Sequence, residues 1–267
     1  MTFRVVIPAR YGSVRLPGKA LLTIAGKPLL QWVHERAVAS GASEVWIATD
    51  DERIERVALH FGAKVVMTRS EHASGTDRIA EVALARAWEP NSIVVNVQGD
   101  EPLMPPRVID QVAHLLRDDP AAQMATLAAP LRRRADLADR NVVKLVSSKN
   151  GYALYFSRAA IPCDRDAALE RGRADGGSTQ TSIGHHPERE LLAIARRHLG
   201  IYAYRVVALK QLTATAPTAL ESLEKLEQLR ALEIGLSIRV ADAIEVPLAD
   251  VNTREDLVAA ERLLLSR

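Results

Sequence analysis

The sequence predicts an α/β fold in which helices cover both faces of a doubly wound, mostly parallel sheet. In the first half of the chain, short apolar strands alternate regularly with amphipathic helices, which is the pattern of a parallel sheet. From about residue 142 the pattern changes, because two strand-like segments meet at the turn Lys149-Asn150-Gly151. We therefore expect an antiparallel region inserted into a larger parallel core.

The elements of the first half follow from apolar runs and from residues that begin or end helices. Asp50 or Asp51 is a natural N-cap, and Gly41 and Gly62 suit the ends of two helices. The expected strands are 5–7, 44–49, 64–68, 92–102 and 123–130, and the expected helices are 27–40, 51–61, 74–88 and 105–117.

The second half contains the strongest single helix prediction, over residues 218–235. Thr218 and Glu221 form a capping box, leucines recur at helical spacing, and Gly235 ends the helix. A long polar stretch, 165–197, is expected to be a mobile or disordered loop that leads into a short helix at 188–197. The other expected elements are strands at 142–148, 151–158, 198–209 and 237–246 and a capped terminal helix.

These changes of pattern divide the chain into three expected parts. They are an α/β core at 1–141, an inserted strand region at 142–215, and a helix-strand-helix segment at 216–267 that completes the core. In such sheets ligands bind at the carboxyl ends of the strands, which places the loop after residue 7 and the turn after residue 97 at one edge.

Composition narrows the class of protein without identifying it. The net charge of +2, from 35 basic and 33 acidic residues, is too balanced to indicate nucleic-acid or membrane binding. The short arginine runs 132–134 and 196–197 lack neighbouring aromatic residues, so a solvated surface explains them better than a nucleic-acid contact. A single cysteine, Cys163, and the absence of a signal-like or membrane-length apolar run favour a cytoplasmic protein.

The loop after the first strand is basic and stiffened by glycine and proline. Arg10, Arg15 and Lys19 fall within ten residues of one another, which favours an anion site over ordinary solvated charge. Neither G-x-G-x-x-G nor a true P-loop is present, because five residues separate Gly12 from Gly18 and alanine follows Lys19. The missing G-x-G-x-x-G also argues against a nicotinamide oxidoreductase.

Three other polar features allow more than one interpretation. Asp100 follows a buried strand, where it either caps the next turn or holds Mg²⁺ beside a bound triphosphate. The segment S-G-T-D-R at 74–78 begins a helix, so its hydroxyls either cap that helix or contact a nucleobase. His198 and Tyr202 share one face of a strand, which suits core packing as well as a ligand site.

The motifs together resemble the 3-deoxy-manno-octulosonate (Kdo) cytidylyltransferase family. The opening I-P-A-R-Y-G-S-V-R-L-P-G-K is similar to the family signature, and its R-L-P-G-K favours the Kdo branch over the sialic-acid branch. Further blocks occur in family order and cover most of the chain outside 165–196: S-G-T-D-R-I-A-E-V, N-V-Q-G-D-E-P, G-Y-A-L-Y-F-S-R-A-A-I-P, R-H-L-G-I-Y-A-Y-R and L-E-K-L-E-Q-L-R-A-L. The resemblance implies a nucleotide-diphospho-sugar transferase-like fold.

The resemblance implies a reaction and a set of site residues. CMP would pass from CTP to the anomeric hydroxyl of Kdo with release of pyrophosphate, activating the sugar for lipopolysaccharide synthesis, by direct attack and without a covalent protein nucleophile. Arg10, Lys19 and Asp100 are the implied catalytic residues. The implied nucleotide contacts are Arg10, Ser13, Arg15, Lys19, Ser74, Gly75, Thr76 and Gln98, and the implied sugar contacts are Arg158, His198, Tyr202, Glu227 and Gln228.

The implied cofactor is Mg²⁺, held by Asp100 and by a residue near the last helix. The family's last motif begins V-D-T, whereas this chain has V-N-T, so Asn252 stands where an aspartate is expected. Asp250 is the alternative ligand, two residues earlier on the same face of an extended chain. The resemblance also implies a homodimer formed through residues 142–209. Remaining alternatives are an amino-Kdo or sialic-acid acceptor and a nucleotide-binding module without activity.

Overall fold

The computed structural model describes residues 2–12, 16–131, 133–163, 192, 194–248 and 250–266. The strands are β1 (Phe3–Pro8), β2 (Thr23–Ile24), β3 (Lys27–Pro28), β4 (Glu44–Thr49), β5 (Lys64–Met67), β6 (Ile93–Asn96), β7 (Met124–Pro130), β8 (Lys144–Ser147), β9 (Ala153–Ser157), β10 (Arg196–Arg205) and β11 (Ile238–Asp242). The helices are η1 (Lys19–Leu21, a 3-10 turn), α1 (Leu29–Val38), α2 (Glu52–His60), α3 (Gly75–Ala85), α4 (Pro106–Arg117), α5 (Arg134–Ala138), α8 (Val206–Thr213), α9 (Ala219–Glu224), α10 (Glu227–Glu233) and α11 (Arg254–Leu265).

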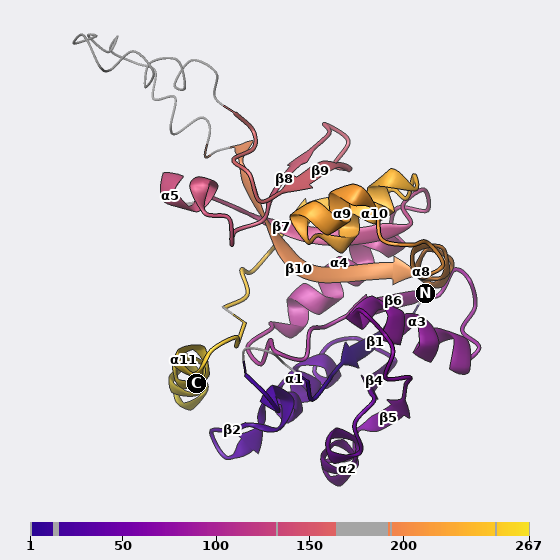
Figure 1. The fold of residues 1–267 in the computed structure, drawn as a ribbon, viewed down its shortest axis with the longest axis vertical. Coiled ribbons are helices and arrows are strands. Elements are labelled where there is room, and N and C mark those ends of the chain that lie inside the picture. Colours follow the sequence, from indigo (N-terminus) through magenta and orange to yellow (C-terminus); the bar gives the residue numbers. More distant parts are fainter. Residues whose placement is uncertain are drawn as a thin grey trace, which may run out of the picture.

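One sheet organises the described chain, with strand order β11-β7-β10-β6-β1-β4-β5 (Figure 1). Strands β6, β1, β4 and β5 run parallel, as do β11 and β7. β10 runs antiparallel to both of its neighbours, β6 and β7, and its first two residues, which lie beyond β6, pair with β8 as well as with β7. The sequence prediction of a mostly parallel α/β sheet with an antiparallel addition is therefore confirmed.

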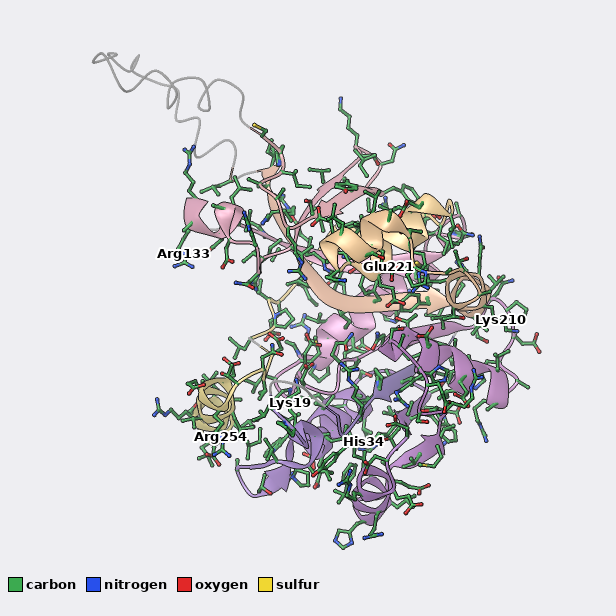
Figure 2. The ribbon with its side chains drawn as sticks, in the orientation of Figure 1. Lys19, His34, Arg133, Lys210, Glu221 and Arg254 are labelled. Carbon is green, nitrogen blue, oxygen red and sulfur yellow. The ribbon has the colours of Figure 1, made fainter. Side chains whose placement is uncertain are left out.

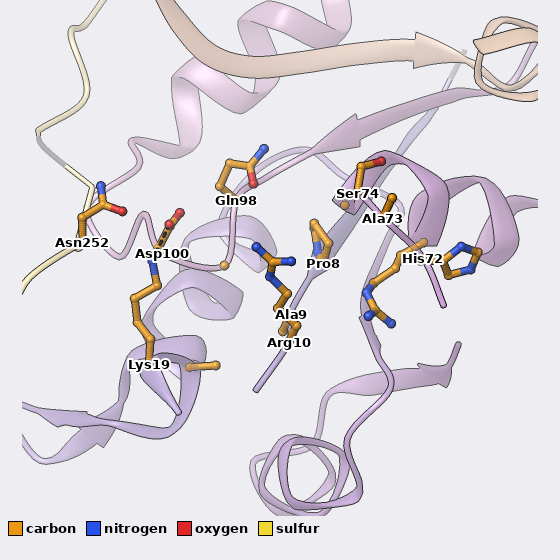
Figure 3. A pocket seen from close by; sticks show the side chains of 14 residues that line it. Pro8, Ala9, Arg10, Lys19, His72, Ala73, Ser74, Gln98, Asp100 and Asn252 are labelled. Atoms are coloured by element: carbon orange, nitrogen blue, oxygen red, sulfur yellow. Dashed lines mark hydrogen bonds and ion pairs between the residues drawn. The ribbon is translucent and has the colours of Figure 1, made fainter. Parts of the chain in front are cut away.

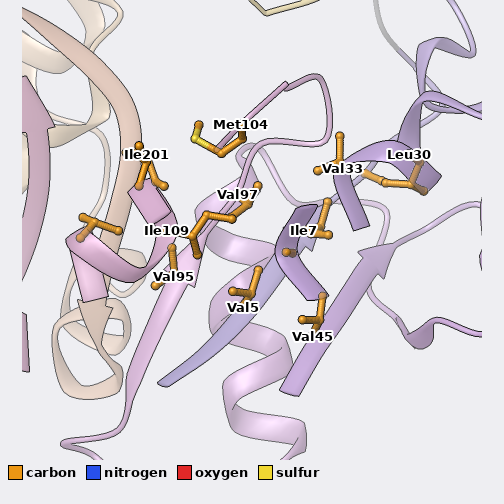
Figure 4. Close-up of a cluster of buried hydrophobic side chains, with 14 of the residues drawn as sticks. Val5, Ile7, Leu30, Val33, Val45, Val95, Val97, Met104, Ile109 and Ile201 are labelled. Carbon is orange, nitrogen blue, oxygen red and sulfur yellow. The ribbon is translucent and has the colours of Figure 1, made fainter. Parts of the chain in front are cut away.

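Helices cover both faces of the sheet because successive side chains of each strand point to opposite sides. Val5 and Ile7 of β1 pack into a core with α1, α2 and α4, part of which Figure 4 shows. Val6, between them, packs on the other face into a second core with α3, α8 and α10. β1 contains a continuous apolar run instead of alternating apolar and polar residues because both of its faces are buried.

β10 links the predicted insertion to the predicted core. The strand lies between β6 and β7 in the middle of the sheet, although its sequence falls within 142–215. Among the described strands of this sheet, only β8 and β9 lie off the main path, as an antiparallel pair (Figure 1). The boundaries 1–141, 142–215 and 216–267 stay a prediction. Within the described ranges, no helix is long and apolar enough to cross a membrane.

The predicted strand 198–209 is wrong at its end, because β10 stops at Arg205 and α8 begins at Val206. The guanidinium of Arg205 donates to the carbonyls of Leu116, Asp119 and Ala122, which anchors the strand end under α4. The backbone N–H of Val206 then donates to Ser92, so the chain turns away from the sheet there. Apolar β-branched residues at 206 and 207 had favoured a longer strand.

The predicted helix 218–235 is also wrong in one respect, because it is two helices, α9 and α10. Thr218 and Glu221 form the expected capping box, but Lys225 adopts the left-handed conformation with φ 55° and Leu226 is extended. The break turns Leu226 into the core, where its side chain is 6% exposed. It also makes Glu227 the first residue of α10, at the edge of a cavity described below.

The stretch 165–197 mostly lies outside the described residues, and so does most of the predicted helix at 188–197. Its last two residues, Arg196 and Arg197, belong to β10 and pair with β7 and β8, so the helix prediction is wrong at that end. Arg196 makes an ion pair with Asp242 of β11, with a distance of 2.7 Å between Nε and Oδ1.

Candidate active site

Three connected cavities lie at the carboxyl edge of the parallel strands. Cavity 1 has a volume of about 310 Å³, cavity 2 about 540 Å³ and cavity 3 about 210 Å³. Gln98, just after β6, lines all three, and Asp100 lines the first two. A Cβ on Gly99 would lie 2.8 Å from the carbonyl oxygen of Pro8, so only glycine lets this turn pack against the end of β1.

Cavity 1 collects the residues predicted to bind a triphosphate. Figure 3 shows Arg10 and Lys19 entering it from the loop after β1, with Gln98 and Asp100 opposite and Ser74 at the other end. Gly75, at the start of α3, also lines it. Ser13 and Arg15, predicted in the same loop, lie outside the described residues. The basic loop, the N-terminus of α3 and one carboxylate therefore meet around one space, as an anion site requires.

Lys19 and Asp100 form the closest charge pair of this cavity. Lys19 Nζ lies 2.6 Å from Asp100 Oδ2 and 2.9 Å from the carbonyl oxygen of Val251 (Figure 3). Their side chains are 15% and 26% exposed, so the pair is partly shielded from water. The left-handed Gly18 just before it helps to place Lys19 inside the molecule (Figure 2).

The end of cavity 1 near Asp100 is suited to a cation. Two oxygens, from Asp100 and Val251, already converge on the ammonium group of Lys19. Asn252 lines the same end, and its amide donates a very short hydrogen bond to Asp250. In the described part of the chain, no three His, Cys, Asp or Glu side chains gather as a complete metal site. A site of few protein oxygens matches Mg²⁺, which keeps water and phosphate ligands.

Glu101 adds a buried carboxyl group behind this end of the cavity. Its Oε2 is buried and has no hydrogen-bond partner among the described residues. Burial, and then the charges of Asp100 and Asp250, raise the pKa of Glu101 to about 8. This residue lies in the wall of cavity 2.

Cavity 3 is lined by polar side chains from widely separated segments. His198, Tyr202, Glu227 and Gln228, all predicted as sugar contacts, line it together with Thr76. The hydroxyl of Tyr202 and Oδ1 of Asn96 are buried and lack hydrogen-bond partners among the described residues. One can donate and the other can accept, so this cavity is prepared for a ligand that carries hydroxyl groups.

The aromatic wall of cavity 3 is uncharged at neutral pH. The ring of His198 packs edge-on against Phe156 and lies 5.2 Å from that of Tyr202, and its Nε2 is 3.0 Å from Thr126 Oγ1. Burial lowers the pKa of His198 to about 3 and raises the pKa of Tyr202 well above its usual value. The described lining of this cavity contains no lysine or arginine, so it differs sharply from cavity 1.

The N-terminus of α3 faces both cavities. Ser74 caps the helix through Asp77, as the capping interpretation predicted, and its hydroxyl also lies 3.3 Å from Glu227 Oε1. Thr76 donates to Glu227 Oε2 at 2.7 Å and lines cavity 3 instead of cavity 1. Thr76, predicted as a nucleotide contact, therefore hydrogen-bonds to Glu227, predicted as a sugar contact.

Arg158 is the predicted sugar contact that the structure does not bring to the others. Its Nε donates to the carbonyl of Glu224 at 2.8 Å and Nη1 to the carbonyl of Arg140 at 2.9 Å. It lines none of the three cavities. Arg197, which the sequence had suggested only as a surface charge, lines cavity 2.

Several residues of the site were missed at the sequence level. His72 and Arg78 line cavity 1, where Arg78 is 4% exposed and pairs with Asp50 at 2.5 Å. Asn96 and Tyr204 line cavity 3. A signal was present for Asn96, which is the one polar residue in an apolar strand, and for Arg78, which interrupts the apolar face of its helix.

The fold and site define an α/β protein with a cationic cavity and a polar cavity that share Gln98 in their lining. A family model described as "Cytidylyltransferase" matches residues 4–238, and the chain belongs to this cytidylyltransferase family. It is 50% identical to a 3-deoxy-manno-octulosonate cytidylyltransferase of Thioalkalivibrio sulfidiphilus over 99% of both chains. It is 51% identical to the protein of that name from Idiomarina loihiensis, over 98% of both.

Solved structures give the same result. A structure of CMP:2-keto-3-deoxy-manno-octonic acid synthetase complexed with CTP superposes with a TM-score of 0.85. It is 38% identical and covers 100% of this chain and 99% of its own. A cytidylyltransferase from Leptospira borgpetersenii, at 16% identity and a TM-score of 0.62 over 100% of this chain and 88% of its own, shares the fold.

Proposed function

We propose that the protein transfers CMP from CTP to Kdo, giving CMP-Kdo and pyrophosphate. The observation that carries the proposal is that Gln98 lines both a cationic cavity and a neighbouring hydrogen-bonding cavity whose described lining contains no lysine or arginine. A triphosphate needs the first and a polyhydroxylated sugar suits the second. Full-length relatives near 50% identity carry the name of this enzyme.

The reaction is a direct displacement at the α-phosphorus of CTP. The anomeric hydroxyl oxygen of the sugar forms the new O–P bond, the bond from phosphorus to the α,β-bridging oxygen breaks, and pyrophosphate leaves. The hydroxyl proton passes to solvent. Arg10 and Lys19 offset the charge that develops on the phosphates, and the cavity walls hold the two substrates in line. No residue of the chain forms a covalent intermediate.

Asp100 and Asn252 would hold Mg²⁺, with Asp250 placed to orient the amide of Asn252. When bound, the ion neutralises phosphate charge and lowers the pKa of the attacking hydroxyl. Lys19 must then exchange Asp100 for phosphate oxygens. The predicted contact of Arg158 with the sugar carboxylate requires its guanidinium to leave the carbonyls of Glu224 and Arg140.

The proposed homodimer is supported by apolar side chains that the described chain leaves exposed. Leu154 on β9 is 61% exposed, and Leu220 and Leu223 on α9 are 37% and 82% exposed. The ends of these elements meet, because Ser157 donates to Glu224 at 2.6 Å. Light scattering after gel filtration tests the proposal, and a monomeric mass at micromolar concentration would refute it. The cytoplasmic location stays a prediction.

One assay tests the proposed function. Pyrophosphate release is measured with CTP, UTP, ATP or GTP, with and without Kdo, across Mg²⁺ concentrations. We expect release only with CTP and Kdo together. Release that is indifferent to the base, or that needs no acid sugar, would overturn the proposal. Faster release with 8-amino-Kdo or a sialic acid would change the acceptor and leave the reaction class intact.

A further inference from the structure

The carboxylate of Glu227 faces cavity 3 and is also contacted by three other side chains. Its Oε2 accepts from Thr76 at 2.7 Å, and its Oε1 accepts from Arg230 Nη2 at 2.8 Å and lies 3.3 Å from the hydroxyl of Ser74. Ser74 lines cavity 1, whereas Thr76 and Glu227 line cavity 3. One carboxylate therefore joins α10 to the N-terminus of α3, where the two cavities meet.

Arg230 reaches this site only through Glu227. Arg230 is 5% exposed and lines none of the three cavities. Nη1 donates to the carbonyl of Thr215 at 2.7 Å, and Nε lies 3.1 Å from Glu221 Oε2 as an ion pair without making a hydrogen bond. The planar guanidinium is thus fixed from behind while one nitrogen points at Glu227, a geometry that lysine cannot reproduce.

The charges around Glu227 explain why such a partner is needed. Burial raises the pKa of Glu227, and the neighbouring carboxylates Asp77 and Glu221 raise it further. The hydroxyl of Thr76 and the charge of Arg230 act in the opposite direction. The other titratable groups in the cavity, the buried Tyr202 and Tyr204 and the half-buried His198, are uncharged at neutral pH. Arg230 is therefore the cation that offsets this carboxylate.

We infer that Arg230 is a positioning residue for the sugar site. It keeps Glu227 ionised and directed across to Ser74 and Thr76, so that the carboxylate can accept hydroxyl groups of the acceptor sugar beside the bound nucleotide. This inference rests on the proposed function for the identity of the sugar. Its electrostatic part does not, because it concerns Glu227 in the protein without ligands.

The first experiment measures the pKa of the Glu227 carboxyl group directly and needs no substrate. The protein is labelled with ¹³C at glutamate carboxyl groups, the Glu227 signal is assigned by its loss in Glu227→Gln, and its pH titration is followed by NMR. Removing an opposite charge at this distance raises a carboxyl pKa by about one unit or more. We expect that rise in Arg230→Gln and a smaller one in Arg230→Lys. An unchanged titration in both variants would overturn the inference.

The second experiment separates positioning from a merely structural role. With CTP saturating, we expect Arg230→Lys to raise the KM for Kdo about tenfold, with a smaller change in kcat and in the KM for CTP. The acid limb of kcat/KM for the sugar should move to higher pH in Arg230→Gln. Arg205→Lys is the matched control, because Arg205 is also buried but holds only backbone carbonyls.

The outcomes distinguish the inference from the proposed function. If Arg230→Lys and Arg205→Lys both lower the melting temperature and neither shifts the KM for Kdo or the pH profile, Arg230 is structural and the inference fails. If the unaltered protein does not turn over CTP with Kdo, the proposed function fails, and the NMR titration still decides the electrostatic part. If Arg230→Gln does not fold, Arg230→Lys, which keeps the charge but not the planar guanidinium, carries both tests.

Discussion

Cavities 1 and 3 are built from different kinds of sequence. Cavity 1 is lined mainly by short loops at the ends of β1, β5 and β6 and by the start of α3, and its important groups are charged. Cavity 3 takes side chains from β6, β7, β10, α3, α8 and α10, and its important groups are neutral or buried. A triphosphate can be bound by a local cluster of charge, whereas the hydroxyl groups of a sugar need many weak contacts from an enclosed, prepared surface.

The difference appears in how each cavity satisfies its polar groups without ligands. In cavity 1 the charges neutralise each other, as Lys19 does with Asp100. In cavity 3 the hydroxyl of Tyr202 and Oδ1 of Asn96 are left without partners in the described chain. Unpaired buried groups cost stability, and a ligand that pairs them recovers that cost. Cavity 1 is therefore expected to tolerate being empty better than cavity 3.

The largest predicted effect comes from breaking cavity 1 at Asp100. Asp100→Asn removes the carboxylate that pairs with Lys19 and would ligate Mg²⁺. We expect kcat to fall by about 10²- to 10³-fold, as for loss of one main electrostatic contact to a transition state. Pyrophosphate release at saturating substrates measures this. Asp118→Asn, an exposed carboxylate paired with Arg117, is the control. A loss of less than about fivefold would remove Asp100 from the proposed mechanism.

Tyr202→Phe tests cavity 3 in the opposite sense, because the variant should bind sugar less well and be more stable. Losing one hydrogen bond to the ligand should raise the KM for Kdo about five- to tenfold, and removing an unpaired buried hydroxyl should add about 1 kcal/mol to the free energy of unfolding. Tyr152→Phe is the control, because the Tyr152 hydroxyl donates to Asp119 at 2.6 Å. That variant should lose stability and leave the KM unchanged. If the two variants changed stability and the KM for Kdo in the same way, the unpaired Tyr202 hydroxyl would not be a group that awaits the ligand.

Asn252→Asp sharpens the description of cavity 1. The added carboxylate should lower the Mg²⁺ concentration for half-maximal activity about three- to tenfold, because affinity for hard cations follows ligand charge. Without metal, the new charge beside Asp250 should lower stability, since the present amide donates to Asp250. Mg²⁺ titration of activity and of melting temperature measures both. Asn141→Asp, which alters cavity 2 only, is the control. An unchanged titration would show that residue 252 is not a ligand.

The same contrast explains what could be predicted from the sequence. Arg10 and Lys19 were predicted as an anion site from their chemistry and their place after a strand, whereas Asp100 was left open between a turn cap and a metal ligand; all three line cavity 1. His198, Glu227 and Gln228 needed the resemblance to a known family, because nothing local marks them. Whether they bind the predicted ligands is for the experiments above to decide.

The fold was predictable where burial is regular and failed where a long-range contact overrides local preference. The alternation of strands and helices in the first half fixed those elements, since β1, β4, β6 and β7 are buried on both faces. Helical periodicity continues through 218–235, yet Leu226 is buried only because Lys225 breaks the helix. Arg205 likewise ends β10 by capping carbonyls more than eighty positions away in the chain. Such partners cannot be read from a local window.

The smallest predicted effect concerns stability and belongs to cavity 3. The pKa of His198 is lowered to about 3 by burial, so between about pH 6.5 and pH 3 the unfolded chain binds one proton more than the folded protein. Falling pH therefore destabilises the fold through this histidine, by up to about 1.4 kcal/mol per pH unit. Above pH 6.5 this contribution is constant.

His198→Gln should reduce that slope, because glutamine fills a similar volume and does not titrate. Chemical unfolding at several pH values from 6 to 4.5 measures the free energy of each protein, and the difference between them cancels the carboxylates that both share. His60→Gln, which alters an exposed histidine, accounts for the loss of one histidine elsewhere. Parallel pH profiles for His198→Gln and the unaltered protein would mean that this imidazole can take up a proton in the folded state. The His198 side of cavity 3 would then be open to water, and the two cavities would differ less than we propose.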